Sequence, residues 1–138
     1  MKKELVYQSR DKEIEVFEDE FGKITLKEMP HEAAVMVALE NNSLILISQF
    51  RTAVEEIIIQ LPGGGIKRNE RPKDAARREL LEETGIVCGD AIYIGSIQPS
   101  ACYSNCVTHV YFTKDILESR KKRGFYSSFS HTGRAGVP

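Results

Sequence analysis

The sequence predicts an α/β protein of the α+β kind, with a mixed sheet, one strong helix and a small β-region at the N-terminus. Two observations support this fold class. Short apolar runs bounded by turn residues recur along the chain, which is typical of strands. The stretch from Pro72 to Thr84 begins with a proline and is followed by Gly85, which is typical of a helix with its C-terminal cap.

Length and composition limit the classes of protein. A chain of 138 residues is expected to form one main domain with a buried core. The formal net charge of −1 argues against a protein that binds bulk nucleic acid or a membrane surface. No apolar run approaches the ~20 residues of a membrane span, and residues 1–10 lack the apolar core of a secretory signal. Three cysteines without a CxxC pair favour reduced thiols, so we expect a cytoplasmic protein.

Residues 1–30 are expected to form the N-terminal β-region. Strands are predicted at 14–17 and 24–26, with a turn at 20–22 between them. This region contains too little apolar mass to be stable alone, so it should pack on the main domain or on a partner chain.

The main domain is expected over residues 31–122. Its predicted strands cover residues 33–39, 43–48, 57–61, 91–97 and 107–112. The first two should form a hairpin, because only a short polar turn separates them. A weaker helical candidate covers Asp115–Lys122, and residues 123–138 show neither period and are expected to be a tail.

The predicted helix carries Glu79, Glu82 and Glu83 within an arc of about 100°. Three ionised carboxylates this close repel one another, so their pKa values rise or a cation lies among them. Hard divalent cations prefer carboxylate oxygens and often bind together with substrate phosphates. The arrangement favours a metal site for a phosphate-containing substrate, with a solvated helix face as the alternative.

A fixed pattern of residues surrounds these glutamates. In order it consists of Gly64, five residues, Glu70, seven residues, Arg78-Glu79-Leu80, one residue, Glu82-Glu83, one residue and Gly85-Ile86. The pattern resembles the Nudix box at every defined position. The stretches 49–51, 60–64 and 103–109 are similar to the ADP-ribose pyrophosphatase branch of the Nudix hydrolases. The resemblance covers about residues 12–113 and implies a Nudix-type α/β/α sandwich with a mixed sheet.

The resemblance also implies roles for the acidic residues. Glu79, Glu82, Glu83 and the backbone carbonyl of Gly63 would bind Mg²⁺ or Mn²⁺. Such metals would neutralise a diphosphate and lower the pKa of an attacking water. We take Glu82 and Glu83 as the catalytic residues, with Glu83 as the candidate general base. A glutamate from a later loop serves as base in many similar enzymes, which leaves Glu118 as an alternative.

Other residues of the pattern are expected to be structural. By resemblance, Glu70 and Arg78 form an ion pair that ties the turn to the helix. Gly64 and Gly85 should supply backbone conformations that larger residues disfavour. Arg51 follows a predicted strand and would contact a substrate phosphate or the distal ribose, where a guanidinium donates in pairs. An ordinary surface arginine is the alternative for Arg51.

These residues together predict a Mg²⁺-dependent pyrophosphohydrolase that cleaves ADP-ribose or a related nucleoside diphosphate derivative. ADP-ribose would give AMP and ribose 5-phosphate. Two alternatives within the class are an enzyme for nucleoside triphosphates, oxidised ones included, and one for diadenosine polyphosphates. An alternative of another class is a Nudix-like nucleotide-binding module without catalysis.

The C-terminal part departs from the pattern, because a final helix usually covers one face of the sheet in this family. Three explanations stay open: a shortened helix at 115–122, a partner chain over the sheet, or a foreign C-terminal segment at 123–138. An uncovered sheet face would expose an apolar patch that favours association. On this ground, and because of the N-terminal β-region, we predict a homodimer.

Overall fold

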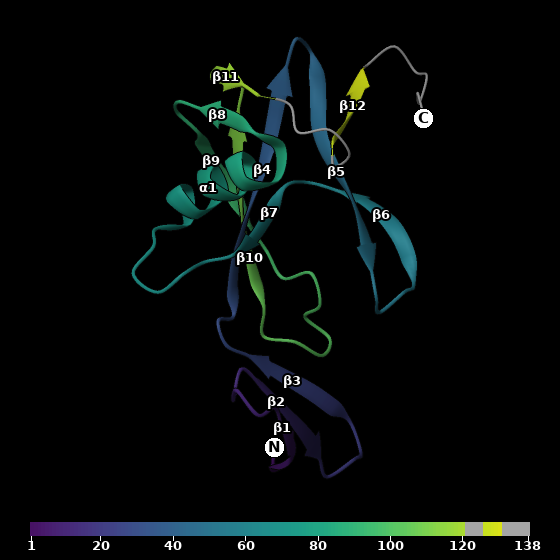
Figure 1. Cartoon of the computed structure of the whole chain (residues 1–138). Helices are drawn as coiled ribbons and strands as arrows, with labels where there is room; N and C mark the ends of the chain where they lie inside the picture. The colour runs from purple at the N-terminus through teal and green to yellow at the C-terminus, as the bar shows by residue number, and fades with distance from the viewer. Residues whose placement is uncertain (121–125, 131–138) are drawn as a thin grey trace.

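The computed structural model describes residues 1–120 and, for the backbone alone, residues 126–130 (Figure 1). Its elements, in chain order, are β1 (Lys3–Gln8), β2 (Ile14–Asp19), β3 (Ile24–Glu28), β4 (Glu32–Glu40), β5 (Ser43–Arg51), β6 (Glu56–Gln60), β7 (Gly63–Gly65), α1 (Pro72–Thr84), β8 (Ile86–Cys88), β9 (Ile92–Ile97), β10 (Val107–Thr113), β11 (Ile116–Ser119) and β12 (Tyr126–Ser130).

The main sheet is mixed. Its strands lie in the order β12-β5-β4-β10-β9, while β6 pairs with β5 and β7 pairs with β4. The central pair, β4 and β10, is parallel, and the neighbouring pairs are antiparallel. The predicted hairpin between β4 and β5 turns at Asn41 and Asn42, both with positive φ, as a two-residue turn of type I′ requires. The predicted α+β fold class with a mixed sheet is confirmed.

The N-terminal sheet, β1-β2-β3, lies at one end of the molecule, beyond the ends of β4 and β10 (Figure 1). It contacts the main domain through the loop before β10. Leu26 donates its backbone N–H to Tyr103, and Glu28 donates its own to the Asn105 side chain at 2.8 Å. Ser104 donates its hydroxyl to the Glu28 carboxylate at 2.6 Å. The N-terminal region therefore packs on the main domain within one chain.

Helix α1 has the bounds that the sequence predicts. Pro72 occupies the first turn, where its missing N–H is not needed, and Gly85 ends the helix in the left-handed conformation at φ 76°. The helix buries Ala75, Ala76 and Leu80 against the central strands, in one core with Met36 and Ile86. None of the described helices combines the length and the apolar character needed to cross a bilayer.

The predicted helix at Asp115–Lys122 is wrong for its described part. Ile116–Ser119 forms β11, which pairs antiparallel with β8. The segment is extended because it satisfies the backbone after α1: Asp115 accepts the Gly89 N–H at 2.8 Å, and Arg120 donates to Gly85 at 3.0 Å. Of the two helical layers of the expected sandwich, the residues described here form one, the layer of α1.

Four further strands escaped the sequence analysis. β1, β7, β8 and β12 are short or lack an apolar alternation, and β7 consists of three glycines. β12 lies inside the expected tail 123–138 and pairs antiparallel with β5. Residues 121–125 and 131–138 lie outside the described part.

Candidate active site

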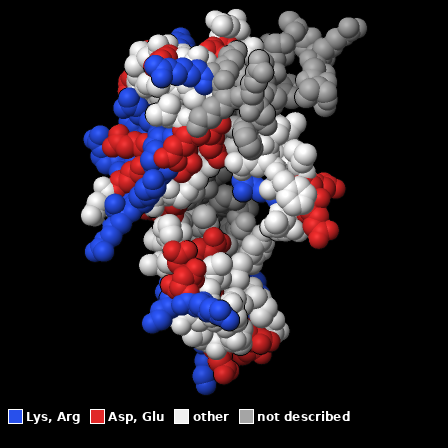
Figure 2. Space-filling model, viewed as in Figure 1, with Lys and Arg blue, Asp and Glu red and all other residues white. Residues whose placement is uncertain are grey.

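Two elements position the candidate site: helix α1 and the glycine strand β7, which pairs with β4 beside the helix. On α1, Glu79 lies about one turn before the adjacent residues Glu82 and Glu83. Glu79 and Glu83 are partly buried and Glu82 is exposed. Basic side chains lie among the acidic ones on the side of the molecule that carries the helix (Figure 2).

Glu83 is held from both sides. Its Oε2 accepts the backbone N–H of Gly63 at 2.8 Å, and its Oε1 accepts Nε2 of Gln49 at 3.1 Å. Burial raises the pKa of the Glu83 carboxyl, and the nearby Glu79 carboxylate raises it further. The Gly63 N–H and the Gln49 amide act in the opposite direction, because they stabilise the ionised form.

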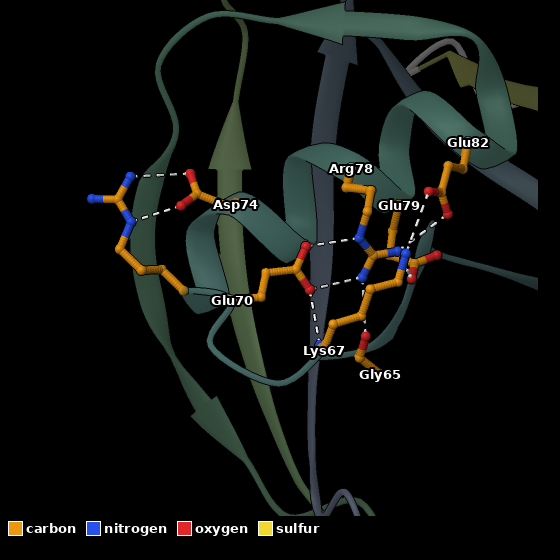
Figure 3. Close-up of polar contacts among 8 residues, drawn as sticks. Gly65, Lys67, Glu70, Asp74, Arg78, Glu79 and Glu82 are labelled. Carbon is orange, nitrogen blue, oxygen red and sulfur yellow. Dashed lines mark hydrogen bonds and ion pairs between the residues drawn. The ribbon is translucent and has the colours of Figure 1, made fainter.

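Glu79 and Glu82 share one cation within the protein, Arg78. Its Nη1 lies 2.5 Å from Glu79 Oε1 and 3.1 Å from Glu82 Oε2 (Figure 3). Lys67 adds a longer contact, 3.9 Å from its Nζ to Glu82 Oε1. Arg78 therefore offsets part of the repulsion among the carboxylates that the sequence analysis identified.

Arg78 also forms the ion pair expected with Glu70. Its Nε and Nη2 donate to the two carboxylate oxygens of Glu70 at 2.7 and 3.0 Å, and Nη2 also donates to the Gly65 carbonyl at 3.1 Å (Figure 3). The hydrogen bond from Arg78 lowers the pKa of Glu70 to about 2. Since Lys67 N–H donates to Glu70 as well, this pair closes the turn between β7 and α1.

The glycines of β7 fit the close approach of the helix. A Cβ at Gly64 would lie 2.7 Å from Glu79 Oε1, and one at Gly63 would lie 2.6 Å from the backbone oxygen of Ala34. A Cβ at Gly65 would find its nearest neighbour at 3.9 Å. Gly63 is therefore required by backbone packing, whereas Gly65 is not. Gly64 is required by its approach to the Glu79 carboxylate; the expectation that it supplies a special backbone conformation is wrong, because its φ is not positive.

Arg51 is linked to the glutamates through two side chains that the sequence analysis did not single out. Its Nε and Nη2 donate to Gln60 Oε1 at 3.1 and 2.9 Å, Gln60 Nε2 donates to Gln49 Oε1 at 3.4 Å, and Gln49 contacts Glu83. The period of two in β5 could have found Gln49. Ile45 and Ile47 are buried, so Gln49 and Arg51 share their face of the strand.

The alternative base Glu118, His109 and the cysteines lie outside this network of contacts. Glu118, the alternative base, lies on β11 beyond the helix C-terminus and forms an ion pair with Arg120. The His109 Nε2 lies 3.1 Å from Glu32 Oε1 within the sheet, which suits a structural role. Cys88, Cys102 and Cys106 are all free thiols.

The donor set suits a hard divalent cation by its chemistry. It offers carboxylate oxygens beside the backbone of a glycine strand, and an ionised carboxylate has about four acceptor positions, more than Glu83 uses. In this arrangement, however, no group of three or more His, Cys, Asp or Glu side chains in the described residues is placed to hold a metal ion. Arg78 forms ion pairs with Glu79 and Glu82, whereas Glu83 accepts hydrogen bonds from Gly63 and Gln49 instead.

Comparison with known proteins identifies the family. The model of the NUDIX domain matches residues 29–125, which is more than half of the chain. The chain belongs to the Nudix family. This match confirms the resemblance that the residues from Gly64 to Ile86 suggested, and Nudix hydrolases generally use divalent metal ions.

Two curated relatives of this Nudix chain come from bacilli. It is 26% identical over 129 residues to the methanol dehydrogenase activator of Bacillus methanolicus, covering 90% of this chain and 70% of that protein. It is 29% identical over 105 residues to the ADP-ribose pyrophosphatase of Bacillus subtilis (strain 168), covering 74% of this chain. The chain spans 57% of the length of that pyrophosphatase.

A solved structure supports the Nudix fold. The crystal structure of an ADP compounds hydrolase superposes with a TM-score of 0.73 at 22% identity, covering 94% of this chain and 76% of that chain. With the family match, this likeness confirms the predicted Nudix family and fold, and the relatives include an ADP-ribose pyrophosphatase, the branch that the resemblance indicated.

Proposed function

We propose that this Nudix protein is a Mg²⁺-dependent pyrophosphohydrolase that cleaves the diphosphate of ADP-ribose or a related nucleoside diphosphate derivative. The observation that carries the proposal is the chain of hydrogen bonds from Glu83 through Gln49 and Gln60 to Arg51. It joins carboxylates suited to a metal with a cation suited to phosphate. The similarity to the Bacillus subtilis ADP-ribose pyrophosphatase supports the substrate class.

In this proposal Glu79, Glu82 and Glu83 hold Mg²⁺ or Mn²⁺, together with the backbone carbonyl of Gly63. The bound metal would neutralise the diphosphate and make water a stronger nucleophile. Glu83 is the proposed general base, because the Gly63 N–H and the Gln49 amide orient its carboxylate, whose ionised form can accept a proton from water. Glu82 supports the metal from the exposed side of the helix.

Arg51 is the proposed substrate contact. Its guanidinium uses Nε and Nη2 on Gln60, and the side chain is exposed at the end of β5. A guanidinium has five N–H donors in a fixed fork, so Arg51 keeps donors for a phosphate or for the distal ribose.

A substrate panel tests the proposal. Purified protein is assayed with Mg²⁺ against ADP-ribose, other nucleoside diphosphate sugars, nucleoside triphosphates and diadenosine polyphosphates, with products resolved by chromatography. The proposal predicts AMP and ribose 5-phosphate from ADP-ribose, at a kcat/KM above that for the triphosphates. Preference for triphosphates or dinucleotides would overturn the substrate class. Tight binding of ADP-ribose by a folded protein without any turnover would indicate a binding module instead.

We also propose that the protein acts as a homodimer in the cytoplasm. The edge strand β9 supports association, since Ile92, Tyr93, Ile94 and Ile97 are each more than half exposed. An edge strand with apolar side chains is a ready template for pairing with another chain. Light scattering at micromolar concentration should give twice the chain mass, and a mass of one chain would contradict the dimer.

A further inference from the structure

The hydrogen-bond chain between Arg51 and Glu83 has a fixed direction. The Arg51 guanidinium can only donate, and an ionised Glu83 carboxylate can only accept. Gln60 must therefore present its carbonyl oxygen to Arg51 and its amide to Gln49, and Gln49 must present its own amide to Glu83. The structure has this arrangement. Arg51 Nη2 lies 2.9 Å from Gln60 Oε1, Gln60 Nε2 lies 3.4 Å from Gln49 Oε1, and Gln49 Nε2 lies 3.1 Å from Glu83 Oε1.

The paired strands β5 and β6 fix the positions of the side chains in this hydrogen-bond chain. Gln49 and Arg51 lie on β5, two residues apart on one face, and Gln60 ends β6, opposite Ile47 in the register. Both glutamines are partly buried, whereas the Arg51 end of the hydrogen-bond chain is exposed. Bonded amides in such a setting polarise one another, and a change at one end of the chain alters the donor at the other.

We propose that Gln49 and Gln60 are positioning residues that couple metal binding at Glu83 to phosphate binding at Arg51. Gln49 orients Glu83 together with the Gly63 N–H, and Gln60 orients both Gln49 and Arg51. The inference rests on the proposed function for its biological meaning, because it assumes a metal at Glu83 and a phosphate at Arg51. By linkage, each ligand then tightens the other by the same factor.

The first test needs neither metal nor substrate. The side-chain amide signals of Gln49 and Gln60 are followed by NMR in the full-length, metal-free protein and in Arg51→Met. The coupling predicts that both amide signals shift, although Arg51 contacts Gln60 and not Gln49. An unchanged Gln49 signal beside a shifted Gln60 signal would overturn the relay.

The second test measures Mn²⁺ affinity by paramagnetic resonance. Gln49→Met should weaken binding about tenfold, as loss of a group that orients a metal ligand commonly does. Gln60→Met should weaken it about threefold, acting only through Gln49. Gln8→Met is the matched control, since it removes a 3.0 Å glutamine–glutamate bond in the N-terminal sheet and should leave Mn²⁺ affinity unchanged.

Gln60→Glu separates the two ends of the chain. A glutamate keeps the acceptor for Arg51 but removes the donor to Gln49, so Mn²⁺ affinity should fall and, by the same linkage, KM for ADP-ribose should rise. Wild-type Mn²⁺ affinity in both Gln60 variants would overturn the coupling. If the wild-type protein binds no Mn²⁺, the proposed function fails, and the NMR result alone decides whether the relay exists.

Discussion

Gly64 and Glu79 lie so close that no larger residue fits at position 64 without moving the carboxylate. A Cβ at Gly64 would lie 2.7 Å from Glu79 Oε1 and 2.8 Å from Glu79 Cδ. The obstacle is the end of the flexible Glu79 side chain and not backbone. A larger residue at position 64 would therefore displace the carboxylate without disturbing the fold.

Gly64→Ala should therefore separate activity from stability. We expect Glu79 to be displaced and kcat/KM to fall about tenfold or more, since misplacement of a catalytic group by about 1 Å costs up to ~100-fold. The free energy of unfolding, measured by urea denaturation, should change by less than about 1 kcal/mol.

Two neighbouring glycines provide controls for this variant. Gly65→Ala should keep both activity and stability, because its Cβ would meet nothing closer than 3.9 Å. Gly63→Ala should destabilise the fold by about 1–3 kcal/mol, since its Cβ would meet the Ala34 backbone. Equal losses of activity in all three variants would contradict the assignment of Gly64 to the carboxylate site.

Glu70→Gln should lower stability in a pH-dependent way. The Glu70 and Arg78 side chains are 15% and 19% exposed, so the loss should lie between the ~1 kcal/mol of a surface pair and the ~3–5 kcal/mol of a buried pair. The pKa of Glu70 is lowered from 4.5 to about 2 on folding. The stabilisation is therefore fully present above pH 4.5 and disappears as the pH falls toward 2.

Urea denaturation at several pH values checks this expectation. The difference between wild type and Glu70→Gln should be constant from pH 7 to 5 and shrink between pH 4.5 and 2. Glu118→Gln, which removes the more exposed pair with Arg120, should cost less than about 1 kcal/mol at pH 7. A Glu70 effect that grows on acidification would contradict the lowered pKa.

Gly85→Ala should destabilise the protein by about 1–2 kcal/mol, because Gly85 closes α1 at φ 76° and a Cβ is strained in that conformation. In the wild type the Gly85 N–H donates to the Leu81 carbonyl at 2.9 Å, and an alanine would have to adopt the same strained conformation to keep this bond. Thermal denaturation measures the loss. An unchanged melting temperature would show that this helix end relaxes without strain.

The sequence was sufficient to predict those elements whose local residue pattern agrees with their place in the fold. The bounds of α1 follow from Pro72 and Gly85, and the hairpin of β4 and β5 follows from two apolar runs around Asn41 and Asn42. Both are set by residues close together in the chain. The fold class could therefore be predicted without any knowledge of long-range contacts.

Long-range pairing explains what could not be predicted. Ile116–Ser119 has no strong strand signal of its own and is extended because β8 supplies partners for its backbone. Likewise, the spacing of glutamates on α1 does not reveal that Arg78 pairs with Glu70, Glu79 and Glu82 together. The sequence likewise does not reveal that β5 and β6 place Gln60 beside Gln49, and Gln49 beside Glu83.

The most direct test of the central claim is the Mg²⁺-dependent release of AMP from ADP-ribose by wild type and by Glu82→Gln. Glu82 is exposed, so the variant should fold normally, which circular dichroism checks. The account predicts wild-type turnover that stops when EDTA removes the metal, and a loss of at least about 100-fold in Glu82→Gln. Turnover by Glu82→Gln at the wild-type rate, or turnover that persists in EDTA, would contradict it.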